Sequence, residues 1–265
     1  MYATKYHKPG SVADAVAALG SAEDAKVLAG GQTLLPTMKQ HLAAPSDLID
    51  IRAIDGMSAI SVSGDSVTIG AGTTHMDVAG SAAVQEAIPG LACLAAGIGD
   101  PHVRAMGTIG GSVANNDPAA DYPAAVLGLG ATVITNAREI AADDFFNGMF
   151  ETALNEGEII TELQFPKAQS SGYSKFDNPA SRYAIVGVFV AQTGGAVRVA
   201  VTGAGADGVH RHAGMEAALT ADLSPAALDA VAVSADGLLS DVHASADYRA
   251  HLVKVMAKRA VAAMS

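Results

Sequence analysis

Apolar residues recur with helical spacing near the start of the chain and then gather into short runs. Over residues 11–19 they fall on one face of a helix that has Ser11 as its N-cap. Two apolar runs, 26–29 and 48–51, predict short buried strands, and residues 33–40 predict a second helix between them. This part of the chain therefore predicts a compact α/β unit.

The middle of the chain predicts a second unit that begins with a hairpin. Residues 60–62 and 67–69 flank Gly64-Asp65, which is typical of a turn that joins antiparallel strands. The segments that follow are predicted to be helical at 76–86, 90–98 and 124–129, and extended at 132–134 and 159–163.

The last third of the chain predicts a different arrangement, a strand meander followed by helices. Residues 166–172, which are rich in Ser, Gln and Gly, are the best candidate for a linker. Beyond them, residues 183–192 and 196–202 predict two strands, and three helices are predicted before the C-terminus. The expected class is α+β. A two-lobed domain over 1–166, with lobes of about 1–55 and 56–166, precedes a smaller domain of antiparallel sheet plus helices over 173–265.

Composition and charge narrow the function. The chain has 265 residues, is 50% hydrophobic and carries a formal net charge of −11, which argues against a nucleic-acid partner. Its single cysteine, Cys93, cannot form an internal disulfide or supply the four ligands of an iron–sulfur cluster. The eight histidines form no metal-ligand motif. The first 25 residues lack a signal-peptide core, and no apolar run approaches the ~20 residues of a membrane span. A soluble cytoplasmic protein is expected.

Two glycine segments suggest a ligand. The first is Ala29-Gly30-Gly31-Gln32-Thr33-Leu34-Leu35-Pro36, and the second runs from Thr108-Ile109-Gly110-Gly111-Ser112 to Asn115 and Asp121. Each places adjacent glycines beside a hydroxyl residue, so that consecutive N–H groups can converge on an anion. An ordinary β-to-α turn explains the first segment when it is taken alone. The pair predicts a diphosphate held from two sides, as in a dinucleotide.

A third glycine segment, Gly203-Ala204-Gly205-Ala206-Asp207-Gly208, fits the pattern of a nicotinamide dinucleotide site. That site needs a helix that starts within the motif and then a second parallel strand. Here His210 and His212 interrupt the segment, and residues 223–232 predict a helix. We therefore interpret it as a simple turn.

The two glycine segments resemble those of the FAD-binding medium subunit of the molybdenum hydroxylases, the group that contains carbon monoxide dehydrogenase and xanthine oxidase. The resemblance spans nearly the whole chain. It includes Tyr6-His7-Lys8-Pro9, Gly70-Ala71-Gly72-Thr73-Thr74-His75, Ile98-Gly99-Asp100-Pro101-His102-Val103-Arg104, Tyr173-Ser174-Lys175-Phe176 and Tyr183-Ala184-Ile185-Val186. It implies a two-lobed FAD-binding domain like that of vanillyl-alcohol oxidase.

The resemblance also implies which residues bind the cofactor. These are Ala29, Gly30, Gly31, Gln32, Thr33, Leu34, His75, Thr108, Ile109, Gly110, Gly111, Ser112, Asn115, Asp121, Lys175 and Tyr183. In the family, the Asp at the Asp121 position hydrogen-bonds FAD, and the Lys175 and Tyr183 positions lie near the isoalloxazine. The chain departs from the family at Asn178-Pro179-Ala180-Ser181-Arg182, where members more often have Arg-Arg-x-Gly-Asp.

The function implied is an electron-transfer subunit with no catalytic residue for the organic substrate. Its partners would be a large subunit with a molybdenum cofactor and a small subunit with two [2Fe–2S] clusters, in a dimer of heterotrimers. Electrons from the clusters would pass through FAD to an external acceptor. The alternative is a stand-alone FAD-dependent oxidoreductase of the same superfamily, which would need its own substrate pocket.

Overall fold

The N-terminal lobe is a three-stranded parallel sheet with the strand order β1–β3–β2. The computed structural model describes residues 1–265. In this lobe the elements are β1 (Lys5–His7), α1 (Val12–Ser21), β2 (Ala25–Leu28), α2 (Leu34–Lys39) and β3 (Asp47–Asp50). Successive side chains of β3 face opposite sides: Leu48 packs with Met38 of α2, whereas Ile49 joins the main core with Ala15 of α1. The sheet therefore buries both faces.

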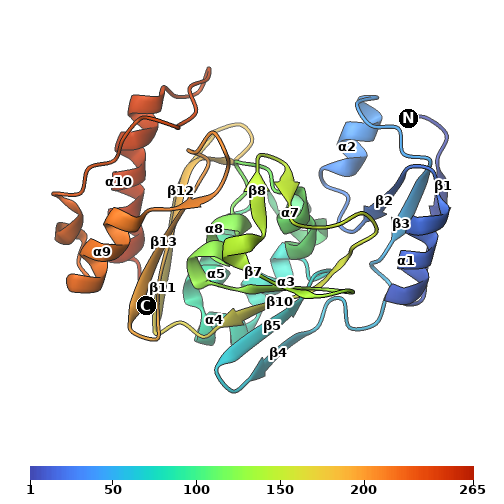
Figure 1. Ribbon diagram of the computed structural model, residues 1–265, viewed down its shortest axis with the longest axis horizontal. Helices are drawn as coiled ribbons and strands as arrows, with labels where there is room; N and C mark the ends of the chain where they lie inside the picture. Colours follow the sequence, from blue (N-terminus) through green and yellow to red (C-terminus); the bar gives the residue numbers. More distant parts are fainter.

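The second lobe lies between the N-terminal lobe and the C-terminal part of the chain (Figure 1). Its five-stranded antiparallel sheet has the order β4–β5–β10–β6–β7. The strands are β4 (Ile60–Ser63), β5 (Ser66–Gly70), β6 (Thr132–Thr135), β7 (Glu139–Ala141) and β10 (Ile160–Pro166). The helices are α3 (His75–Gly80), α4 (Ala82–Ala87), α5 (Pro89–Ala96), α6 (Pro101–Met106), α7 (Ile109–Asn115) and α8 (Tyr122–Leu129). A 3₁₀ turn, η1 (Ala142–Asp144), and a hairpin, β8 (Phe146–Gly148) with β9 (Glu151–Thr152), precede β10.

The C-terminal part is a four-stranded antiparallel sheet in the order β11–β12–β13–β14, packed on helices. Its elements are β11 (Ser170–Asp177), β12 (Ala184–Thr193), β13 (Ala196–Thr202), β14 (His210–Arg211), α9 (Ala213–Ala221), η2 (Pro225–Leu228) and α10 (Ala246–Ala262). Strand β12 is apolar on both faces because α8 packs against it as well as α10 (Figure 1). Phe189 belongs to the core shared with the second lobe, and its neighbours Val188 and Val190 belong to the core under α10.

Most elements predicted from the hydrophobic pattern are confirmed. Ser11 caps α1 by accepting a hydrogen bond from the N–H of Asp14 at 3.1 Å. The hairpin around Gly64-Asp65 and strands β12 and β13 also form where expected. No helix combines the length and the apolar character that crossing a bilayer requires.

Three segments differ from the sequence prediction. The predicted helix 76–86 is two helices, because Ser81 is extended and caps α4. The predicted linker 166–172 is reduced to residues 167–169, since Pro166 ends β10 and Ser170 begins β11. Residues 223–232 contain only the 3₁₀ turn η2 in place of a helix.

The Gly203–Gly208 segment is a turn, as interpreted from the sequence. It leads into β14, and Gly205 forms an isolated bridge with Leu238. The next helix, α9, begins only at Ala213, so no helix N-terminus lies within the glycine motif.

Candidate FAD-binding site

One cavity is lined by residues from all three parts of the chain. Its volume is about 630 Å³, which lies within the range typical of small-molecule and cofactor sites. Residues 26–34 line it from the N-terminal lobe, residues 107–121 contribute from the second lobe, and residues 181–183 contribute from the C-terminal part. Of the residues that the sequence assigned to the cofactor, all except Ile109 and Lys175 line this cavity.

The first glycine segment presents a row of free backbone donors to the cavity. None of the N–H groups from Gly30 to Leu34 donates to a protein acceptor. Gly31 adopts the left-handed conformation with φ of +70°, which permits the sharp turn. A Cβ on Gly30 would lie 2.2 Å from the carbonyl oxygen of Met106, so only glycine allows the segment to pass so close to the second lobe. Converging free N–H groups of this kind bind anions such as a diphosphate.

The second glycine segment is a helix, α7, and its glycine N–H groups are already used. Gly110 donates to the carbonyl of Ala71 at 2.8 Å, and Gly111 donates to the hydroxyl of its N-cap Thr108 at 3.1 Å. A Cβ on Gly110 would lie 2.4 Å from that of Ala71, so this glycine serves close packing. The expectation of a second anion-binding nest is therefore wrong for these two N–H groups.

The second segment instead offers side chains to the cavity. Both Ser112 and Asn115 are half-buried, line the cavity and make no hydrogen bond through their side chains. They are free to bind hydroxyl or phosphate groups. Ile109, by contrast, is fully buried and its side chain belongs to the main core, because it lies on the inner face of α7.

Asp121 is a buried carboxylate at the cavity wall. Its Oδ1 accepts a hydrogen bond from the Tyr173 hydroxyl at 2.5 Å and lies 3.1 Å from the Nζ of Lys175. Burial raises the pKa of the Asp121 carboxyl, while the positive charge of Lys175 and the Tyr173 hydrogen bond act in the opposite sense. Two residues of β11 thus bind the carboxyl group of Asp121, the residue just before α8.

Lys175 does not line the cavity. Its ammonium group donates to the carbonyl of Gly97 at 3.0 Å and to that of Arg182 at 2.9 Å, in addition to its contact with Asp121. The sequence assigned Lys175 to direct cofactor contact. The structure connects it to the cavity through Asp121 and through the turn that carries Tyr183.

The segment that departs from the family pattern forms a tight turn beside the cavity. The side chain of Asn178 accepts hydrogen bonds from the N–H groups of Ala180 and Ser181, and Arg182 adopts a left-handed conformation with φ of +62°. This turn places Tyr183 at the cavity, where the tyrosine remains 43% exposed. Burial and the negative charge of Asp117 raise the pKa of the Tyr183 phenol, and an interaction with Thr33 opposes this shift.

His75 lines the cavity as a neutral imidazole. It is buried, and burial together with the nearby charge of Arg104 lowers its pKa to about 4. Its Nδ1 atom has no hydrogen-bond partner, and neither has the hydroxyl of Tyr122, whose ring centroid lies 5.3 Å from that of His75. Buried polar groups are normally paired, so these two atoms are exceptions, and only His75 of the two residues lines the cavity.

The structure adds a wall that the sequence reasoning missed. Leu154, Ile159 and Ile160 line the cavity together with Lys26 and Ile51. Leu154 and Ile159 come from the connection between the β8–β9 hairpin and β10, and Ile160 begins β10. The only signal for this wall in the sequence was the apolar pair Ile159-Ile160, which was assigned to a strand. The hairpin connection is brought to the N-terminal lobe by tertiary packing.

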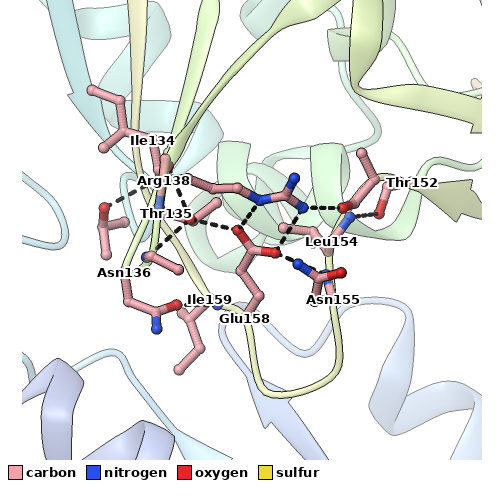
Figure 2. A network of polar contacts seen from close by, with 12 residues as sticks. Ile134, Thr135, Asn136, Arg138, Thr152, Leu154, Asn155, Glu158 and Ile159 are labelled. Atoms are coloured by element: carbon pink, nitrogen blue, oxygen red, sulfur yellow. Dashed lines mark hydrogen bonds and ion pairs between the residues drawn. The ribbon is translucent and has the colours of Figure 1, made fainter.

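An ion pair holds this wall in shape, as Figure 2 shows. The guanidinium group of Arg138 donates to Glu158 through Nε and Nη2, each at 3.0 Å, and to the carbonyl of Ala153. Glu158 also accepts from the N–H of Asn155 at 2.8 Å and from the hydroxyl of Thr135 at 2.7 Å. These bonds, with Arg138 first, lower the pKa of the Glu158 carboxyl to about 2.

Comparison with known proteins identifies the family. Residues 2–168 match the FAD binding domain in molybdopterin dehydrogenase, and residues 171–264 match the CO dehydrogenase flavoprotein C-terminal domain. The chain is 35% identical to the nicotine 6-hydroxylase medium subunit of Paenarthrobacter nicotinovorans, over 98% of this chain and 96% of that one. It is 37% identical to the carbon monoxide dehydrogenase medium chain of Hydrogenophaga pseudoflava, over 97% of this chain and 95% of that one.

The solved structures agree with the sequence relatives. The fold superposes with a TM-score of 0.90 on a chain of the reconstituted CO dehydrogenase from Oligotropha carboxidovorans, at 34% identity over 98% of this chain and 97% of that chain. The mixed helix and sheet architecture, the two matched domains and the near-complete coverage all lead to one assignment. The chain belongs to the family of FAD-binding medium subunits of the molybdenum hydroxylases, which are oxidoreductases.

Proposed function

We propose that this chain binds FAD in the cavity and is the electron-transfer subunit of a molybdenum-containing hydroxylase. The observation that carries the proposal is the row of unbonded N–H groups from Gly30 to Leu34 along the cavity wall. Gly30 is buried and Gly31 and Leu34 are half-buried, whereas Gln32 and Thr33 are exposed to solvent. An N–H group without a partner at the first three positions costs free energy, which a ligand that supplies acceptors would remove. A diphosphate supplies several anionic oxygens close together.

The residues around this row suit the other parts of the cofactor. Ser112, Asn115 and Asp121 offer a hydroxyl, an amide and a carboxylate to the sugar-like hydroxyl groups. The apolar wall of Leu154, Ile159 and Ile160 suits a flat ring system at one end. FAD supplies redox chemistry that accepts electrons singly or in pairs, and the chain's own residues bind, orient and shield it.

We further propose two partners. A large subunit with a molybdenum cofactor would oxidise the substrate, and a small subunit with two [2Fe–2S] clusters would deliver electrons to this chain. The proposal is supported by relatives named as medium chains of carbon monoxide dehydrogenase, which are parts of multi-subunit enzymes. The chain would then pass the electrons to an external acceptor, in a dimer of heterotrimers. Two domains, residues 1–166 and 173–265, would both contact the cofactor.

Co-expression with candidate large and small subunits tests this function. We expect a purified complex that contains FAD, iron and molybdenum, and whose flavin absorbance bleaches when the complex receives its substrate. Preparations that lack the iron–sulfur subunit should keep an oxidised flavin under the same conditions. If a small organic substrate reduces the flavin of this chain without the other subunits, the chain is a stand-alone flavoenzyme and the proposal is wrong.

A further inference from the structure

Lys175 uses all of its donors inside the protein. A lysine ammonium group has three N–H donors and no acceptor. Here Nζ donates to the carbonyl oxygens of Gly97 and Arg182, and it lies 3.1 Å and 3.3 Å from the two carboxylate oxygens of Asp121. The side chain is 9% exposed and the residue does not line the cavity. No donor remains for a molecule bound there.

Asp121 keeps capacity for one more bond. An ionised carboxylate accepts about four hydrogen bonds. The Tyr173 hydroxyl and the two contacts of the Lys175 ammonium group use three of these positions. Asp121 itself lines the cavity although it is only 4% exposed. The remaining position can therefore accept from a hydroxyl or ring N–H group of a ligand.

The fold creates a slot for the Tyr173 hydroxyl. Tyr173 and Lys175 are two residues apart on β11, so their side chains lie on the same face of the strand. A Cβ on Gly187 of the neighbouring strand would lie 2.4 Å from the Tyr173 hydroxyl oxygen. Glycine at that position lets the tyrosine pass across β12 to Asp121. The hydroxyl has no other partner.

We propose that Tyr173 and Lys175 are positioning residues that hold Asp121 fixed and ionised as an acceptor for FAD, without touching the cofactor themselves. The proposal deepens the proposed function, because it takes FAD as the ligand of the cavity. The C-terminal part of the chain would thereby control a contact made by the second lobe. Loss of either partner would weaken FAD binding only while Asp121 is present.

A double-mutant cycle tests this coupling in the assembled complex. The variants are Tyr173→Phe, Asp121→Ala and the double variant that carries both changes. Tyr248→Phe is the matched control, because Tyr248 lies on α10 and is 44% exposed. We expect Tyr173→Phe to raise the FAD dissociation constant roughly tenfold, as for loss of a hydrogen bond to a charged group. In the Asp121→Ala background the same change should alter it by less than about twofold. Equal losses in the two backgrounds would overturn the proposal.

Lys175→Met provides a second readout that simple misfolding does not produce. The titratable groups around Asp121 are Lys175, Tyr173 and Asp177 from β11, Tyr122 from α8 and Tyr183, and Cys93 of α5 lies near Tyr173. Removing the only cation among them should move the midpoint of the pH dependence of FAD affinity upward by about one pH unit or more. An unshifted midpoint would overturn the proposal, and Lys258→Met, in the exposed Lys258–Asp229 pair, is the control.

Failure of the proposed function is separable from failure of this inference. If the wild-type complex holds no FAD, the function is wrong before any variant is made. If the wild type holds FAD and the cycle is additive, only the positioning role is wrong. The visible circular dichroism of the bound flavin, compared between wild type and Tyr173→Phe, should change with affinity if Asp121 moves.

Discussion

The Arg138–Glu158 pair gives the sharpest test of how the cavity wall is built (Figure 2). The change is Glu158→Gln, which keeps the size of the side chain and removes its charge. The side chain of Glu158 is 2% exposed and accepts four hydrogen bonds, two of them from the guanidinium group of Arg138. A glutamine accepts through one oxygen, and its NH₂ group faces donors where the second carboxylate oxygen was.

The expected cost follows from the pKa of Glu158, which falls from 4.5 to about 2. Each pKa unit corresponds to about 1.4 kcal/mol, which gives an upper limit near 3 kcal/mol for the charged form. The Arg138 side chain is 43% exposed, so solvent screening reduces the free energy of unfolding that is lost to about 1–2 kcal/mol.

The effect should depend on pH in one direction. A carboxyl with a lowered pKa stabilises the fold fully above the unfolded value of 4.5, and this stabilisation is lost as the pH falls from there through about 2. The difference in the free energy of unfolding between the wild type and the variant, measured with urea, should therefore be largest at pH 7. By pH 4 the gap should narrow by roughly 0.8 kcal/mol, because the unfolded carboxyl takes up a proton first.

The variant should also retain FAD less well, since Leu154 and Ile159 on the same connection line the cavity. Glu216→Gln is the control. Glu216 lies on α9, does not line the cavity, and forms a similar ion pair with Arg211 through two hydrogen bonds. Equal loss of flavin in the two variants, or a cost of Glu158→Gln that does not change with pH, would refute the reasoning.

Three further changes test the rest of the site. Gly31→Ala should weaken FAD retention at least tenfold, because φ is +70° and the new Cβ would lie 2.9 Å from a leucine side chain, whereas Gly64→Ala at an open hairpin turn should leave it unchanged. Gly111→Val should lower the flavin content of the folded complex. Gly205→Val, whose side chain would meet a carbonyl at 2.5 Å, should lower the melting temperature without releasing flavin from the folded fraction. As the pH falls from 6.5 to about 4, the wild type should lose stability, because the unfolded chain protonates His75 and the buried, neutral His75 of the folded chain does not accept the proton. His75→Phe removes this titration, so urea unfolding should show a loss that is smaller by roughly 2–3 kcal/mol.

The two glycine segments show what the local sequence can predict and what it cannot. Both were predicted to hold anions through free N–H groups, and only the first has them. The difference is not local, because Gly110 is paired by the carbonyl of Ala71, which follows β5 nearly forty residues earlier in the chain. No acceptor from the fold reaches Gly30 or Gly31.

Lys175 and β11 show the same limit. The family resemblance placed Lys175 and Tyr183 near the cofactor. The start of β11 was assigned to a linker because residues 166–172 are rich in Ser, Gln and Gly. The strand forms because it pairs along its length with β12, which is buried on both faces. That pairing directs Tyr173 and Lys175 toward Asp121, and Lys175, which was expected at the cofactor, does not line the cavity.

The sequence by itself determined the helices and strands whose apolar positions repeat with a clear period, the caps such as Ser11, and the turns that need glycine. These depend on interactions within a few residues, so the local pattern is sufficient. Only the tertiary structure decided which backbone donors stay free, which charges are paired, and which walls enclose the cavity. Each of these depends on a partner far away in the chain, as Glu158 depends on Arg138 and Asp121 on Lys175. A hydrogen-bond donor is available to a ligand only when the folded chain leaves it without an acceptor, and that is a property of the whole fold.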